Sequence, residues 1–137
     1  MKKWFVVAIC LALSACARNH MVSYVPNPNV IEPTKVIEQI IRTQPPAYAR
    51  PVPYAVSVKN DYIELQVTEP GGWFGGPGNV TNTIYYKNIG KVILNKYDIW
   101  CVEILDRAGN WMYYVRSFDE SEAKLFIDAL YTMMGRQ

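Results

Sequence analysis

Histidine is nearly absent from this chain of 137 residues, which contains only His20. Enzymes that transfer acyl groups usually need a histidine base inside the folded domain. His20 precedes every apolar pattern of the predicted domain, and we interpret it as a solvated linker residue. His, Cys, Asp and Glu also show no cluster with the spacing of metal ligands. The sequence therefore predicts a protein that is not an enzyme and that uses no metal or cofactor.

Excess charge is lacking as well, because 14 Lys and Arg stand against 12 Asp and Glu, a formal net charge of +2. Lys2 and Lys3 lie in a segment that we expect to be removed, after which basic and acidic residues are equal in number. A protein without excess positive charge has little electrostatic attraction for nucleic acid or an anionic membrane surface. We therefore expect no nucleic-acid partner.

No apolar run at the N-terminus is long enough for a permanent membrane span. The run from Trp4 to Leu13 is roughly half the length that a spanning helix needs. It follows two lysines and ends in Ser14, Ala15 and Cys16. A cationic start, a short apolar run and small residues are typical of a cleaved secretion signal. We interpret residues 1–15 as a signal peptide.

The sequence Leu13-Ser14-Ala15-Cys16 resembles the lipobox of bacterial prolipoproteins. In that family the cysteine thiol is lipid-modified and becomes the first residue of the mature chain. The resemblance implies that Cys16 carries a fatty acid such as palmitate and anchors the protein in the cell envelope. In the lipoproteins that this sequence resembles, an Asp directly after the cysteine often favours retention in the inner membrane. Ala17 occupies that position here, which favours the outer membrane, facing the periplasm. A plain cleaved signal with an incidental cysteine is the alternative.

Cysteine is too scarce for a disulfide framework. Cys10 lies in the predicted signal, so with Cys16 acylated only Cys101 remains as a free thiol. Cys101 lies within an apolar strand pattern, and we expect it to be buried and inert, with a reactive or intermolecular role as the alternative.

Residues 16–53 precede the predicted β domain. We expect 16–32 to be an extended tether that reaches on the order of 50 Å and lets the domain stand clear of the membrane. Residues 33–53 are predicted to form a short helix and a stiff connector with four prolines. The helix places Val36, Ile37, Ile40 and Ile41 on one face, which should dock on the domain. A proline-rich recognition segment is the alternative for the connector.

Residues 54–137 alternate apolar and polar side chains and then change to helical spacing. Tyr54–Val58 and Ile63–Val67 predict a hairpin that turns at Asn60-Asp61. Further strands are expected at 81–86, 91–94, 99–105 and 111–116, with a corner at 88–90. A C-terminal helix, capped by Asp119 or Ser117, should pack by a stripe of apolar residues: Ala123, Phe126, Ile127, Leu130, Met133 and Met134.

We therefore predict an α+β fold, mainly β, with about six antiparallel strands in a bent sheet or partly open barrel and a C-terminal amphipathic helix packed on it. Residues 85–94, 99–105 and 117–130 resemble strands and the helix of the pleckstrin-homology-like superfold. The first hairpin loop, Lys59-Asn60-Asp61, lacks the basic residues that bind lipid headgroups in that family, so phosphoinositide binding is not expected. A small β domain without that kinship is the alternative.

The segment from Glu69 to Asn79 combines five glycines with two large aromatic residues, Trp73 and Phe74. These two side chains either fold back as a lid on the open end of the sheet or project as an anchor for a partner or lipid. We favour the lid because buried aromatic residues are commoner than presented ones. The loop is nevertheless the best candidate for an interaction site.

The anchor, neutral charge and β core together predict a non-catalytic interaction or scaffold module, with an envelope protein as its partner. The alternative is a binder of a small apolar or lipid ligand in the barrel mouth, gated by the glycine-rich loop. In that case Met133, Met134, Trp73 and Phe74 would line the entrance.

Replacing Cys16 by Ser tests the anchor directly. We expect palmitate to label the wild-type chain metabolically and to leave Cys16→Ser unlabelled, because the serine hydroxyl cannot replace the thiol. Mass spectrometry of the wild-type protein should find no Met1. Equal labelling of both chains, or an intact N-terminus, would contradict the lipoprotein interpretation.

Overall fold

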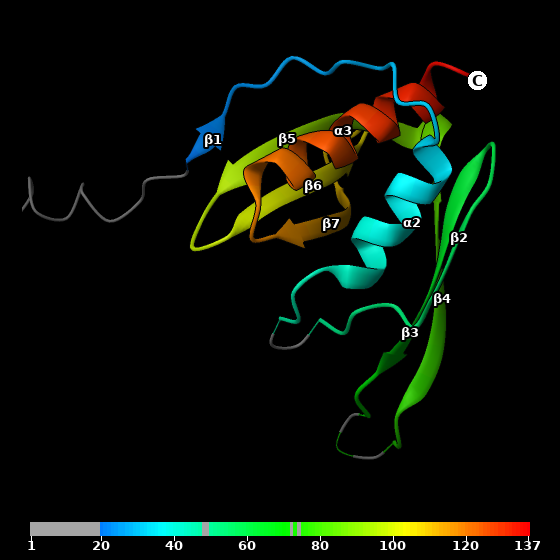
Figure 1. Cartoon of the computed structure of the whole chain (residues 1–137). Coiled ribbons are helices and arrows are strands. Elements are labelled where there is room, and N and C mark those ends of the chain that lie inside the picture. The colour runs from blue at the N-terminus through cyan, green and yellow to red at the C-terminus, as the bar shows by residue number, and fades with distance from the viewer. Residues whose placement is uncertain (1–19, 48–49, 72, 74) are drawn as a thin grey trace, which may run out of the picture.

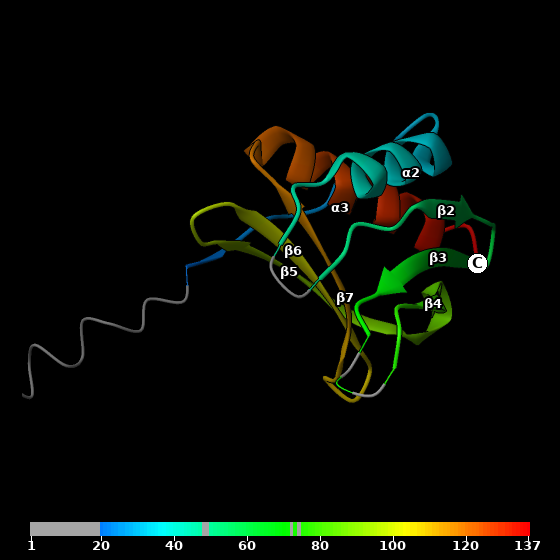
Figure 2. The same ribbon diagram turned by 90° about the horizontal axis from the view of Figure 1, so that it is seen from below.

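The computed structural model describes residues 20–47, 50–71, 73 and 75–137. They form two antiparallel sheets and two helices that lie side by side (Figure 1, Figure 2). This arrangement confirms the predicted α+β, mainly β, fold class, and the described strands form two separate sheets rather than a closed barrel. The helices are α2 (Pro33–Thr43) and α3 (Glu120–Met134).

The four-stranded sheet has the order β1 (Met21–Val22), β5 (Ile89–Lys96), β6 (Trp100–Asp106) and β7 (Trp111–Ser117). The three-stranded sheet has the order β2 (Ala55–Val58), β3 (Tyr62–Glu69) and β4 (Gly78–Tyr85). The helix α3 contacts β5, β6 and β7, whereas α2 contacts both β2 and β7. The helix α2 therefore bridges the two sheets.

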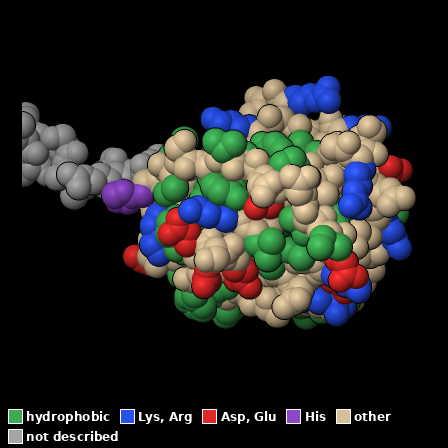
Figure 3. Space-filling model, turned by 45° about the horizontal axis from the view of Figure 1, so that its top comes forward, with side chains coloured by type: hydrophobic (Ala, Val, Ile, Leu, Met, Phe, Trp, Pro, Cys, Tyr) green, Lys and Arg blue, Asp and Glu red, His purple; other side chains and the backbone are tan. Residues whose placement is uncertain are grey.

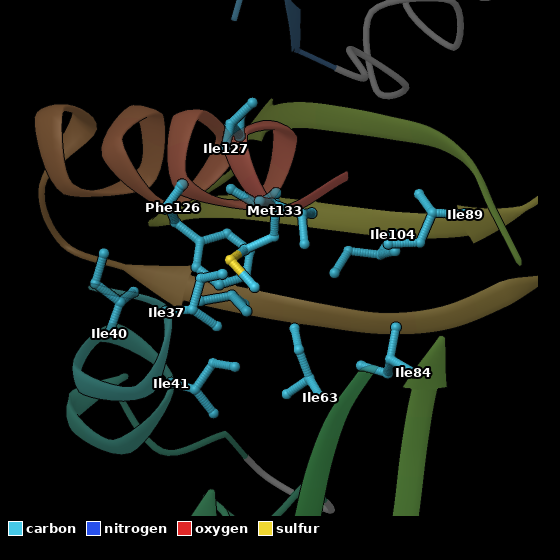
Figure 4. Packing of buried hydrophobic residues seen from close by; sticks show 14 of the residues in the cluster. Ile37, Ile40, Ile41, Ile63, Ile84, Ile89, Ile104, Phe126, Ile127 and Met133 are labelled. Atoms are coloured by element: carbon cyan, nitrogen blue, oxygen red, sulfur yellow. The ribbon is translucent and has the colours of Figure 1, made fainter. Parts of the chain in front are cut away.

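The core lies where both helices meet the inner faces of both sheets. Figure 4 shows side chains from α2, α3 and the strands pointing toward one another. The spacing of Ile37, Ile40 and Ile41 puts them on one face of α2, and all three are buried as predicted. The buried cluster also includes Ile63, Ile84, Ile89, Ile104, Phe126, Ile127 and Met133.

The start of α3 is fixed by the predicted cap. The Asp119 carboxylate accepts hydrogen bonds from the backbone N–H groups of Ser121 (2.6 Å) and Glu122 (3.2 Å). The Ser117 hydroxyl donates to the Glu122 carboxylate. The two bonds to Asp119 satisfy backbone donors that the first helical turn leaves without partners.

Residues 20–32 do not form the free tether that the sequence predicted over 16–32. Met21 and Val22 pair with the edge of β5. The Tyr24 hydroxyl donates to the Asp128 carboxylate on α3 (2.8 Å), which also accepts from the backbone N–H of Asn27 (2.7 Å). Burial and this hydrogen bond raise the pKa of Tyr24 to about 12, so the hydroxyl keeps its proton at neutral pH. The segment is extended but packed on the domain.

The predicted corner at residues 88–90 connects the two sheets. A short 3-10 helix, Tyr86–Asn88, separates β4 from β5, and the register of β5 against β6 shifts between Ile89 and Lys91. Gly90 lies at this shift. A Cβ atom added there would lie 2.5 Å from the Cα of Arg107 and from the backbone oxygen of Asp106. Only glycine fits this close approach without a backbone shift.

Replacing Gly90 by Ala is expected to destabilise the fold by about 1–3 kcal/mol, because backbone atoms cannot easily move aside. The change should lower the midpoint of thermal unfolding by several degrees. Gly75→Ala is the matched control, since nothing lies within 4 Å of a Cβ atom at that position. Equal melting temperatures for the two variants would contradict this account of the corner.

Candidate functional site

The glycine-rich loop lies at the end of a long hairpin. Strands β3 and β4 pair along their whole length, from Tyr62 and Tyr85 at the base to Glu69 and Gly78 at the loop. Figure 1 shows this end of the hairpin extending beyond the helices and the four-stranded sheet. The hairpin therefore carries the predicted interaction loop away from the core.

Trp73 is 98% exposed at this tip. The favoured interpretation, in which this side chain folds back as a lid, is therefore wrong for Trp73. Five glycines around it offer few side chains to pack against, and the loop extends past the apolar core. Phe74, the second predicted residue, lies outside the described residues. An exposed indole in this position can serve as an anchor for a partner.

Strand β4 is an edge strand in the described part of the chain, because it pairs only with β3. Its sequence from Gly78 to Tyr85 contains no charged residue and no proline. Natural edge strands usually carry charges, proline or a cover that prevents pairing with another chain. The hairpin thus presents Trp73 together with a strand edge that can form backbone hydrogen bonds.

The predicted ligand entrance is not formed as expected. Met133 is buried in the core, whereas Trp73 is exposed at the hairpin tip, so the two residues do not line one opening. A hollow of about 430 Å³ does lie at the base of the loop. Its lining includes Glu69, Asn82 and Arg50 and is thus partly polar.

Cys101 is buried, as the sequence predicted, and it is a free cysteine. Burial, and secondarily the negative charge of Glu103, raise the pKa of its thiol to about 12. The thiol therefore stays protonated at neutral pH and is a poor nucleophile.

A cluster of arginine and aromatic side chains on β7 and the connector was not predicted from the sequence. The guanidinium carbon of Arg50 lies 4.0 Å from the ring centroid of Trp111 and 4.5 Å from that of Tyr114. Alternation along β7 places Tyr114 and Arg116 on the face opposite buried Val115. This alternation is visible in the sequence and could have indicated that the two side chains share a face. The sequence contains no signal that the connector brings Arg50 to that face.

Gln44 fixes the start of the connector against β7. Its amide nitrogen donates to the backbone oxygen of Ile41 (2.9 Å) and to the Tyr113 hydroxyl (3.0 Å), and its amide oxygen accepts from the backbone N–H of Arg116 (3.4 Å). These contacts direct the connector along the edge of β7. Arg50 reaches the aromatic side chains by this path.

The other predicted features give no further site. His20 is exposed where the described chain begins, and Figure 3 shows basic and acidic side chains interspersed on that face. Cys16 lies outside the described residues. Within the described ranges, no three side chains of His, Cys, Asp or Glu gather as a metal site, and no helix has the length and hydropathy to cross a bilayer.

A scan against protein-family models, a search of curated proteins and a search of solved structures find no match to this chain.

Alkylation of Cys101 tests its environment. With a pKa of about 12 in place of 9.0, the thiolate fraction at pH 8 is about a thousandfold smaller than for a free thiol. We expect iodoacetamide to leave the Cys101 peptide unmodified in the native protein and to modify it fully in guanidinium chloride, as measured by mass spectrometry of peptides. Similar rates in both conditions would contradict burial.

Proposed function

We propose that this protein is a lipid-anchored component of the cell envelope and that it acts without catalysis, as an interaction or scaffold module. Its contact surface is the hairpin of β3 and β4. The observation that carries the proposal is the 98% exposure of Trp73 at the tip of this hairpin. A large aromatic side chain in that position gains free energy when a partner removes it from water.

The partner is an envelope protein that contacts both Trp73 and the edge of β4. Backbone groups at an open strand edge can pair with an extended segment of another chain, while a nearby aromatic anchor adds affinity. The uncharged sequence from Gly78 to Tyr85 supports this mode, since nothing in it repels an incoming strand. The two sheets with a C-terminal helix also support the proposed pleckstrin-homology-like kinship.

The lipobox at residues 13–16 supports the anchor, and the packing of residues 20–32 changes what the anchor implies. His20 already belongs to the docked segment, because its backbone oxygen accepts from the N–H of Lys96 (2.9 Å). The four steps along the chain from Cys16 to His20 can span at most about 14 Å. In the proposed arrangement the domain therefore lies next to the bilayer, at the periplasmic face of the outer membrane, instead of standing well clear of it.

Binding of a small apolar or lipid ligand has less support as a second function. The residues expected to line its entrance are separated, since Met133 is buried and Trp73 is exposed. The hollow at the loop base has charged and polar side chains in its lining. These features suit an apolar ligand poorly.

A photo-crosslinking residue, benzoylphenylalanine, placed at position 73 of the full chain tests the contact in living cells. We expect one protein adduct from this position, because the partner covers the hairpin tip. Phe118 is the matched control position, since it is also aromatic, is 78% exposed and lies outside the hairpin. In addition, Trp73→Ala should weaken binding of the identified partner by about 2 kcal/mol or more.

The same adducts from positions 73 and 118 would show that the hairpin is not a specific contact. Absence of any protein adduct from position 73 would contradict the proposed partner. Crosslinking to lipid alone would assign Trp73 to the membrane surface and would also contradict it.

A further inference from the structure

A second hollow, of about 250 Å³, lies on the outer face of the four-stranded sheet. Strand β6 places Cys101 and Glu103 in its lining, and they alternate with Val102 and Ile104, which belong to the core. Successive side chains of a strand point to opposite faces, so this hollow lies on the face away from α3. Trp73 and the hairpin tip are not part of it.

Arg50 forms one wall of the hollow. Its guanidinium carbon lies over the rings of Trp111 and Tyr114, 4.0 Å and 4.5 Å from their centroids. A guanidinium over an aromatic ring can still direct its N–H donors, which lie in its own plane, at a planar acceptor. Within the described residues, Arg50 forms no ion pair with a carboxylate.

Arg116 is the second cation that lines the hollow, and it is only 5% exposed. Its Nε donates to the backbone oxygen of Pro45 (2.7 Å), and its Nη1 donates to the Tyr114 hydroxyl (3.1 Å). Neither acceptor carries a charge, and the described part of the chain offers Arg116 no carboxylate partner either. Buried guanidinium groups are usually neutralised, because an unpaired buried charge costs free energy.

Glu103 limits the charge of any ligand. Its carboxylate also lines the hollow and accepts a hydrogen bond from the Tyr97 hydroxyl (3.1 Å). Two arginines and one glutamate give the lining a charge of +1, which matches a monoanion better than a dianion such as phosphate. The rest of the lining includes Ile99 and the ring of Trp111, which favour an apolar body.

We propose that this hollow binds a carboxylate that is attached to an apolar or aromatic group. The carboxylate pairs with Arg50 and Arg116, and the apolar group lies against Ile99 and Trp111. The volume is below that of sites for drug-sized ligands, so it suits a small aromatic acid or the C-terminal residue of a peptide. This site is separate from the proposed contact surface of the hairpin and does not depend on it.

The test follows the indole N–H resonance of Trp111 in the full chain, purified in detergent and assigned with Trp111→Phe. Phenylacetate is expected to shift this resonance saturably, with a dissociation constant of about 1 mM or lower. Phenylacetamide, which has the same shape without the charge, should bind at least tenfold more weakly, as should inorganic phosphate. Equal binding of phenylacetate and phenylacetamide, or no saturable shift, would overturn the proposal.

Arg50 is the residue to vary, because Arg116 is buried and its replacement endangers the fold. Arg50→Gln is expected to weaken phenylacetate binding at least tenfold, and Arg136→Gln, which removes the same charge from an exposed position, should leave it unchanged. Equal affinities for the two variants would overturn the assignment to Arg50. Tighter binding of acetyl-Ala-Phe with a free carboxylate than of phenylacetate identifies a peptide terminus as the ligand, and the reverse order identifies a small acid.

Discussion

The two sheets of this protein share no strand within the described residues, so apolar side chains hold them together. The helix α2 supplies the contact, because Ile37 and Ile41 are fully buried where α2 meets β2, β7 and α3. Each buried isoleucine contributes roughly 1.5–3 kcal/mol. The direction in which the hairpin of β3 and β4 extends therefore depends on this packing and on the corner at Gly90.

The edge strands of the two sheets differ in whether another part of the described chain contacts them. Strand β1 covers the edge of β5, α2 lies beside β2, and Gln44 accepts a hydrogen bond from the edge of β7. The described chain provides no such cover for β4. The uncharged and uncovered edge of β4 is consistent with a strand that can pair with a partner.

Local patterns in the sequence predicted much of the fold. Alternation located β2 and β3, the Asp119 cap located α3, and the glycine at position 90 indicated a corner. The docking of residues 20–32 was not predictable, because its contacts with Asp128 join residues about a hundred positions apart and leave no periodicity. Arg50 was missed for the same reason. The exposure of Trp73 was misjudged because a general preference for buried aromatic residues ignores how far a hairpin extends past the core.

Three features of the molecule depart from the rules that stabilise a folded chain: an indole in water at Trp73, an uncharged open edge at β4, and the buried Arg116 with only neutral partners. Trp73 and Arg116 lie outside the cluster of buried apolar side chains, and β4 contributes only Ile84 to it. Proteins tolerate such departures mainly where a function requires them. Contact with two aromatic rings also restricts the Arg50 guanidinium before any ligand arrives, which reduces the entropy lost on binding.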